Sequence, residues 1–539
     1  MTAGSLIGGS LARALGDDSH GAAGATVETT AGKIRGLKVA GGKVDCFKGV
    51  SYGASTAGSG RFLPPAKPEA WTGVRDAVAY GMRAPQLDSQ FRGVVPPEVE
   101  VTDPGGPMSE DCLVLNLWTP GVGRGHKRPV MLWLHGGGYT TGSGAFTIYD
   151  GTELARKHDA VAISINHRLG VFGYLYLAEL GGEKYAQASN VGMLDIVAAL
   201  EWVRDNAEAF GGDPGNVTIF GQSGGGSKAA RMMHTPVAKG LFHKVICESG
   251  GGEVMADQDP AKNIKTGQMI AAATLANLNL TGDQIDKLKA VPYPELLAAG
   301  EAALRTVAEQ TGSRRVGWNV YADDQYITRA FCDWSSSIPL INGTVFSEFR
   351  GNLQQRVDKN AWTQQEIEEH LTSTYGDKKD AVVALFRKTF PNKKVQDVLF
   401  FAMPGTGALA AKREAGTAPV YNYLFTYEYP VDGGITAFHT SELAFVFHNL
   451  HEPQVRVSTG DAPAGYALQD KVSRAWINFA HTGNPSQPGL AWKPFGADDP
   501  QTMVFDTVSE CRNLHYDDLR TLLGNQGGFP MMPAPPRAG

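Results

Sequence analysis

The segment from Val217 to Met233 constrains the fold of this chain more than any other. A short β-branched run, Val217–Phe220, leads directly into Gly221-Gln222-Ser223-Gly224-Gly225, and a helix-compatible stretch, Ser227–Met233, follows. A sharp turn from strand to helix needs residues without a Cβ beside the serine, because the backbone there is crowded and strained. Such a turn exposes the Ser223 hydroxyl at the carboxyl end of the strand, above a helix N-terminus. The alternative is a glycine-rich turn with a passive serine.

Much of the chain alternates short buried strands with helical patterns. The clearest helical pattern follows Asn190, has apolar residues from Met193 to Phe210 on one face, and stops at Gly211-Gly212. The apolar runs that end in glycine or polar turn residues are Val130–Leu134, Ala160–Ile165, Val217–Phe220, Lys244–Cys247, Leu340–Val345 and Val420–Phe425. Strands alternating with helices predict an α/β fold with a large, mostly parallel central sheet covered on both faces.

Residues 26–520 carry this pattern and are predicted to form one domain. The stretches at about 255–335 and 362–415 are helical in pattern. We interpret them as cap insertions over the sheet, because a strand at 340–345 resumes between them. Residues 1–25 are interpreted as a flexible leader or the remnant of an export signal, so a cytoplasmic and an exported location both stay open. Residues 521–539, rich in Gly and Pro, are predicted to be a loose tail.

Composition argues against several classes of function. Apolar residues make up 42% of the 539 residues, enough for a sizeable core. A net charge of -6 without a basic run argues against nucleic acid as the main partner. The sequence has no uninterrupted apolar stretch of about 18 residues, so no membrane span is expected. The five cysteines form no Cys-x-x-Cys pair, and no other ligand cluster is visible, so neither a metal nor a cofactor is expected. The sequence does not predict the oligomeric state.

A second glycine-rich motif, His135-Gly136-Gly137-Gly138-Tyr139, follows directly after a predicted strand. Consecutive glycines let backbone N–H groups turn toward a ligand. Together with the N–H of the residue after a nucleophile, such donors form an oxyanion hole. The alternative, a flexible loop, is weakened by the pairing of this motif with the serine turn.

A serine nucleophile needs a base, and the base needs an acid that orients it. Glu348 comes right after a predicted strand and His439 follows the strand Val420–Phe425, so both are expected at the same sheet edge as Ser223. His243 lies at the wrong end of a strand, and His481 ends a helical pattern. The other histidines after Ser223 are His234, His370, His448, His451 and His515.

Taken in order, the motifs of this chain resemble those of the type B carboxylesterase/lipase family, which includes cholinesterases and para-nitrobenzyl esterases. The resemblance covers about residues 26–520. The motifs that carry it are Gly60–Pro65, Ser109–Asn116, His135–Tyr139, Asn166–Gly170, Asn190–Asp195, Gly221–Gly225, Cys247–Gly250, Gly343–Glu348, Phe438–Leu443 and Trp476–Gly483.

This resemblance implies an α/β-hydrolase fold and a serine hydrolase that cleaves carboxylic esters of small molecules through an acyl-enzyme intermediate. It implies a triad of Ser223, His439 and Glu348. It also implies oxyanion donors at Gly137, Gly138 and Gly224, and supporting ion pairs of Arg61 with Glu110 and of Arg168 with Asp195.

The chain departs from the family pattern at three points. Gln222, a candidate substrate-binding residue, stands where the family usually has Glu. The partner of the family's first disulfide is missing, so Cys112 is expected to be a free thiol. Residues 83–109 contain no Trp, so recognition of a quaternary ammonium by an aromatic platform is not supported.

Two other hypotheses stay beside the simple esterase. One is a binding or adhesion protein on the same fold; such members of the family have lost the nucleophile, whereas all three triad candidates are present here. The other is an esterase specialised for a bulky natural product or a polymer ester. The chemistry would be the same and only the shape of the pocket would differ, and fold analogy cannot choose the substrate.

Overall fold

The computed structural model describes residues 22–87, 106–251, 259–313, 316–355, 357–404, 407–414, 416–431, 433–496, 498–514 and 516–523. Within these residues a 13-stranded sheet has the strand order β1-β2-β3-β5-β7-β6-β8-β9-β10-β11-β12-β13, and β4 pairs with β2. The strands are β1 Ala22–Glu28, β2 Lys33–Val39, β3 Val44–Ser51, β4 Val74–Asp76, β5 Val114–Thr119, β6 Arg128–Leu134, β7 Val161–Ile165, β8 Gly212–Gln222, β9 Lys244–Glu248, β10 Leu340–Val345, β11 Val420–Phe425, β12 Gln501–Phe505 and β13 Glu510–Asn513.

The centre of the sheet is parallel and its margins are antiparallel. From β7 through β6, β8, β9, β10 and β11 to β12, each strand pairs in parallel with the next. The pairs β1–β2, β2–β3, β3–β5, β5–β7 and β12–β13 are antiparallel. All six predicted strands are present and are neighbours in the parallel part, which confirms the predicted α/β class.

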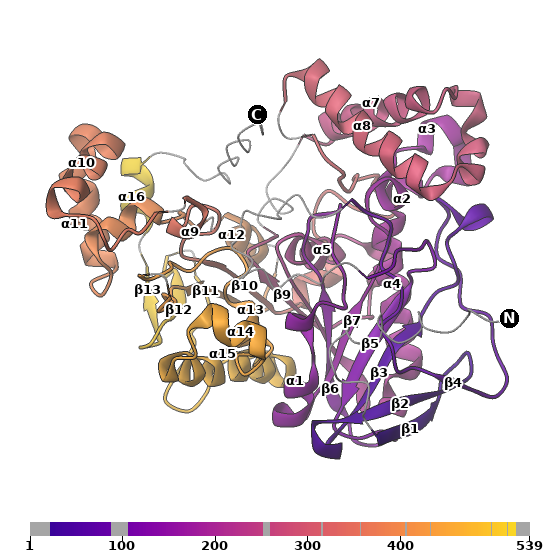
Figure 1. Ribbon diagram of the computed structural model, residues 1–539, viewed down its shortest axis with the longest axis horizontal. Helices are drawn as coiled ribbons and strands as arrows, with labels where there is room; N and C mark the ends of the chain where they lie inside the picture. Colours follow the sequence, from indigo (N-terminus) through magenta and orange to yellow (C-terminus); the bar gives the residue numbers. More distant parts are fainter. Residues whose placement is uncertain are drawn as a thin grey trace, which may run out of the picture.

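Helices cover both faces of this sheet (Figure 1). Their bounds are α1 Thr152–His158, α2 Gly170–Tyr174, α3 Ala178–Gly181, α4 Val191–Asn206, α5 Gly224–Met232, α7 Pro260–Asn277, α8 Tyr293–Thr311, α9 Asn352–Gln355, α10 Gln364–Tyr375, α11 Lys379–Thr389, α12 Gly407–Glu414, α13 Leu443–Val446, α14 Pro453–Thr459, α15 Pro463–Thr482 and α16 Tyr516–Leu523. The helix predicted after Asn190 is α4, which continues as a 3-10 turn to Phe210 before Gly211 adopts a left-handed conformation.

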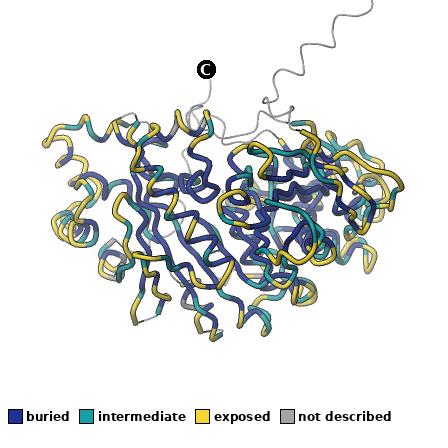
Figure 2. The backbone as a smooth tube through the Cα atoms, turned by 90° about the horizontal axis from the view of Figure 1, so that it is seen from below, coloured by how far each residue is buried: buried dark blue, intermediate teal, exposed yellow. Residues whose placement is uncertain are grey.

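Two hydrophobic cores lie on opposite sides of the sheet. Along β6, Leu132 and Leu134 pack into one core with residues of α2, α4 and α8, whereas Met131 and Trp133 pack into the other with residues of α1, α13 and α15. Figure 2 shows the resulting run of buried strands through the middle of the molecule. Strands that are buried on both faces need apolar residues at every position, which is why their sequences read as continuous apolar runs.

The two stretches interpreted as insertions contain helices at separate places around the sheet. α7 and α8 pack on each other and lie beside α3 at the upper right of Figure 1, whereas α10 and α11 lie at the left with α16. At the amino end, β1 begins at Ala22 and pairs with β2, so the sheet starts ahead of the boundary predicted at residue 26. Residues 1–21 of the predicted leader and 524–539 of the predicted tail lie outside the described residues.

Both ion pairs implied by the family resemblance are present. The Arg61 guanidinium lies 2.5 Å from the Glu110 carboxylate, and that of Arg168 lies 2.6 Å from the Asp195 carboxylate, and all four side chains are buried. Arg61 also donates to the carbonyls of Leu288 and Val291, which ties the insertion to the sheet domain. Among the described residues, we find no helix with the length and hydropathy that crossing a membrane requires.

Candidate active site

Ser223 lies on a strained turn between β8 and α5. Its backbone has φ 57° and ψ −124°, a conformation that L residues rarely adopt, and it forms the N-cap of α5. The turn is held because the Ser223 N–H donates to the Glu248 carbonyl at 2.7 Å. A Cβ at Gly225 would overlap the Leu134 carbonyl of β6, so the helix can start this close to the sheet only with glycine there. The predicted elbow is therefore present.

The loop Gly136–Gly138 lies against this elbow. Gly136 faces Ser223, since a Cβ built on it would lie 3.6 Å from the Ser223 Cβ. The backbones of Gly138 and Gly224 are so close that a Cβ at Gly224 would overlap Gly138. Gly137 and Gly138 both have positive φ angles, 84° and 62°. The glycines whose N–H groups are candidate oxyanion donors therefore meet beside the hydroxyl-bearing residue.

Glu348 and His439 form a close contact at the same edge of the sheet. Nδ1 of His439 lies 2.5 Å from Oε2 of Glu348, and both side chains are buried. The backbone N–H of His439 also donates to the backbone carbonyl of Glu348. Oε1 of Glu348 accepts from the backbone N–H of Val345 in β10. The Glu348 carboxylate is thus held through both of its oxygens, and Nε2 of the His439 ring is oriented away from it.

Gln222 connects the elbow to this pair. Its amide nitrogen lies 3.1 Å from Nε2 of His439. Since Gln222 directly precedes Ser223, the contact joins the loop of His439 to the turn that carries Ser223. The ring of Phe349 also packs against His439, with ring centroids 4.1 Å apart.

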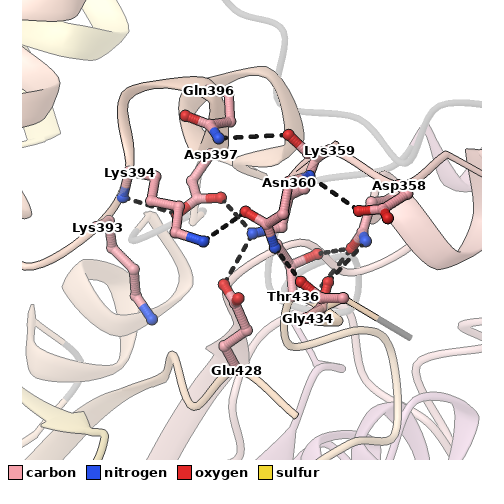
Figure 3. Close-up of polar contacts among 12 residues, drawn as sticks. Asp358, Lys359, Asn360, Lys393, Lys394, Gln396, Asp397, Glu428, Gly434 and Thr436 are labelled. Atoms are coloured by element: carbon pink, nitrogen blue, oxygen red, sulfur yellow. Dashed lines mark hydrogen bonds and ion pairs between the residues drawn. The ribbon is translucent and has the colours of Figure 1, made fainter. Parts of the chain in front are cut away.

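A polar cluster around the buried amine of Lys359 joins segments that follow Glu348 to segments that precede His439 (Figure 3). The amine of Lys359 is fully buried and lies 2.7 Å from the Asp397 carboxylate and 2.8 Å from that of Glu428. Its neighbour Asn360 donates to the Gly433 carbonyl in the loop that leads to His439. Sequence reasoning did not find this cluster.

Asn352 makes the second connection between the two loops. Its side chain accepts from the Thr436 N–H at 3.0 Å and donates to the Gly434 carbonyl at 2.9 Å. The segment that follows Glu348 is thereby bonded to the segment that precedes His439. The bonds of Asn352, together with the sheet, therefore help to fix the distance between Glu348 and His439.

Two further carboxyl side chains, those of Glu248 and Glu442, are buried near the candidate triad. Sequence reasoning missed both of them. Glu248 ends β9 and accepts from the Trp476 indole N–H at 2.7 Å, and Glu442 is hydrogen-bonded to the Tyr423 hydroxyl. Burial raises the pKa of Glu248, and burial followed by repulsion from Glu248 and Glu348 raises the pKa of Glu442. The available signal was their place in the motifs Cys247–Gly250 and Phe438–Leu443.

The other described histidines lie elsewhere. His243 accepts from the Val217 N–H in the middle of β8, and His448 bonds Asp470. His234 is buried beside the Phe331 ring, and His481 lies exposed in the last turn of α15. His515 lies outside the described residues. Of the histidines that the structure describes after Ser223, His439 is the one bonded to both Glu348 and Gln222.

Cys112 is a buried free thiol, and burial raises its pKa well above the ordinary value, so it is unreactive. No group of three or more His, Cys, Asp or Glu side chains that could hold a metal ion occurs in the described part of the chain. The stretch 83–109, in which Trp is missing, is described only at its two ends, since residues 88–105 lie outside.

A nucleophile elbow at the carboxyl end of a central parallel strand, with an acid and a histidine following later strands, defines an α/β-hydrolase. The sequence pattern of the Carboxylesterase family matches residues 23–518. The chain belongs to this family and is a carboxylic ester hydrolase.

Individual relatives agree with that assignment. The chain is 33% identical to the para-nitrobenzyl esterase of Bacillus subtilis (strain 168) over 90% of its own length and 96% of that protein. It is 34% identical to the phenmedipham hydrolase of Pseudarthrobacter oxydans, over 88% and 94%. Among solved structures, an esterase from anaerobic Clostridium hathewayi, described as able to hydrolyse aliphatic aromatic polyesters, has a TM-score of 0.81 at 35% identity and covers 93% of this chain and 97% of its own.

Proposed function

We propose that the protein hydrolyses carboxylic esters through an acyl-enzyme formed on Ser223, with His439 as general base and Glu348 as the acid that orients it. The observation that carries this proposal is the 2.5 Å contact between Glu348 and Nδ1 of His439. Because Nδ1 of His439 is hydrogen-bonded to Glu348, Nε2 is the ring nitrogen that exchanges protons with the reacting groups.

In the first half of the reaction, Oγ of Ser223 attacks the ester carbonyl carbon while His439 accepts the hydroxyl proton. Negative charge develops on the carbonyl oxygen, and the N–H groups of Gly137, Gly138 and Gly224 stabilise it. When the carbon–oxygen bond to the leaving group breaks, His439 returns the proton to the departing alcohol.

The second half repeats this chemistry with water. His439 takes a proton from the water molecule that attacks the acyl carbon, and the same N–H groups stabilise the second oxyanion. Collapse of that intermediate releases the carboxylic acid, and the proton returns to Ser223. Glu348 stays ionised throughout and stabilises the imidazolium at each step.

We further propose neutral esters as the preferred substrates. Gln222, 3.1 Å from His439, contributes hydrogen-bonding groups but no charge to the site. An ester of a bulky natural product or a polymer uses the same chemistry, and the similarity to an esterase described as acting on aliphatic aromatic polyesters makes a polyester a useful member of the substrate panel. Nitrophenyl esters of short and long acyl chains complete the panel.

The test of this function is Ser223→Ala beside a matched control, Ser227→Ala, one turn further along α5. Loss of a triad nucleophile lowers turnover by a factor on the order of 10⁶. We expect that loss in Ser223→Ala, together with loss of labelling by a fluorophosphonate, and near-normal activity in Ser227→Ala. More than a few per cent of wild-type activity in correctly folded Ser223→Ala would overturn the assignment.

A further inference from the structure

Lys228 is a buried lysine close to the candidate nucleophile. It lies on α5, one turn beyond Ser223, and its side chain is fully buried. Its amine donates to the His135 carbonyl at 3.1 Å, and among the residues that the structure describes no carboxylate forms an ion pair with it. Burial alone lowers the pKa of this amine to about 7. A methionine would fill similar space without the cost of desolvating an amine.

The carbonyl that Lys228 holds belongs to the first residue of the glycine loop. The peptide that joins His135 to Gly136 directly precedes Gly137 and Gly138, so a bond to its carbonyl anchors the start of the loop that carries their N–H groups. The His135 ring is fixed as well, because it stacks on the His167 ring with centroids 4.7 Å apart and its Nδ1 contacts the Gly136 carbonyl at 2.8 Å. Glycine has a wide conformational range, so such a loop needs anchors of this kind.

The charge of Lys228 also reaches the same loop. Burial, followed by the charge of Lys228, lowers the pKa of His135 to about 3, and the same two causes lower the pKa of His167. Both rings are therefore neutral. In its protonated form, Lys228 adds positive charge next to a loop of N–H donors, which acts in the same direction as those donors, toward stabilising an anion.

From these contacts we propose that Lys228 is a positioning residue for the oxyanion hole: it fixes the His135 carbonyl and thereby the N–H groups of Gly137 and Gly138. This inference rests on the proposed function, because it assigns a role relative to those donors. A side chain in this role acts on the transition state, in which the oxyanion exists, and has little effect on the binding of the intact ester.

The test compares Lys228→Met with a matched control, Lys412→Met. Lys412 is also a buried lysine that donates to a backbone carbonyl, but it lies on α12, and its partner Ser335 precedes the amino end of β10, the end opposite Glu348. We expect Lys228→Met to lower kcat by about 10- to 100-fold with KM changed less than about twofold, since loss of a whole donor costs about 10²- to 10³-fold. The control should keep wild-type kcat.

A trifluoromethyl ketone separates this role from a merely structural one. The Ser223 hydroxyl adds to its carbonyl carbon and passes its proton to His439, which leaves an oxyanion in the hole. The affinity of Lys228→Met for this ketone should fall in proportion to kcat/KM, while its affinity for the matching trifluoromethyl alcohol stays unchanged. Lys228→Gln keeps a hydrogen-bond donor without the charge and should recover part of the loss in kcat/KM and part of the loss in ketone affinity. If Lys228→Met does not fold, Lys228→Gln replaces it in the test.

Two results would overturn the inference: unchanged kcat and ketone affinity in Lys228→Met, or an equal loss of ketone and alcohol binding. Fluorophosphonate labelling of the wild type separates this failure from failure of the proposed function. If Ser223 is labelled and Lys228→Met behaves as the wild type, the role of Lys228 alone is wrong. If Ser223 is not labelled, the proposed nucleophile is wrong.

Discussion

The amide nitrogen of Gln222 lies 3.1 Å from Nε2 of His439, the ring nitrogen opposite the one that contacts Glu348. The neutral ring, with its proton on Nδ1, can accept a hydrogen bond from this amide at Nε2. A carboxylate at the same position would instead accept from Nε2–H and favour the imidazolium. We therefore expect the residue before Ser223 to affect both the proposed base and the charge that a substrate meets.

Gln222→Glu is therefore expected to move the rising limb of the pH–rate profile of kcat/KM to higher pH, by about one unit. The sign follows because the base must be deprotonated to act, and a neighbouring carboxylate makes its proton harder to remove. The measurement is kcat/KM for a neutral nitrophenyl ester across the pH range, with Gln222→Met as the uncharged control. A limb that stays in place or moves to lower pH would contradict the contact described above.

The same substitution is expected to change the preference for substrate charge. The wild type should use a neutral acyl ester better than the choline ester of the same acyl chain. Gln222→Glu should narrow that difference about five- to tenfold, which corresponds to about 1 kcal/mol of charge interaction. The measurement is kcat/KM for the matched pair of esters in both proteins. Equal or better use of the choline ester by the wild type would mean that a different site binds the cation.

His439→Ala and Glu348→Ala should both impair turnover, the first more than the second. The expected losses are on the order of 10⁶-fold and 10⁴-fold, because the acid only orients and stabilises the base. The matched control is His448→Ala, since His448 is also buried and also bonds a carboxylate, that of Asp470. Greater damage from His448→Ala than from His439→Ala would mean that the wrong histidine has been assigned as the base.

The six neighbouring strands from β7 to β11 and the positions of Ser223, Glu348 and His439 could be predicted from the sequence because the signals are local. Each of these strands is buried on both faces and appears as a short apolar run, and each site residue follows such a run. Neither β12 nor the strands at the two antiparallel margins were among those predicted. In β1, for example, most residues are exposed or half-buried, and the strand contains no continuous apolar run.

The buried polar contacts of Lys359 and Lys228 could not be predicted, because their partners lie far apart in the sequence and neither lysine belongs to a motif of the family. Lys359 is separated by 38 residues from Asp397 and by 69 from Glu428, and no local pattern indicates such pairing. Lys228 interrupts the apolar face of a helix, so sequence reasoning gives no reason to bury it. Such residues become visible only when the fold brings their partners together.

The raised pKa values of Glu248 and Glu442 predict how the stability of the protein depends on pH. A carboxyl whose pKa is higher in the folded state stabilises the fold at low pH, and that contribution is lost as pH rises through the folded-state value. Stability should therefore fall as pH rises from about 4.5, the ordinary pKa, to about 8, the folded-state pKa of Glu248. Glu248→Gln keeps the bond from Trp476 and cannot ionise, so it should reduce that fall. The measurement is Tm against pH for both proteins, and an identical decline would contradict the prediction.

Lys359 offers the clearest prediction about stability, because its amine lies buried between two carboxylates, those of Asp397 and Glu428. Lys359→Met leaves those carboxylates uncompensated and should cost about 3–5 kcal/mol of unfolding free energy. Adding Asp397→Asn should recover part of that loss, since one of the two charges is then removed. Arg124→Met, which removes an exposed pair with Glu208, should cost less than about 1 kcal/mol. Urea denaturation measures the wild type and the three variants. Equal stability of Lys359→Met and Arg124→Met would show that the cluster contributes no more than a surface ion pair does. Because the cluster also contacts the loop before His439, Lys359→Met should lower kcat at temperatures where the variant remains folded.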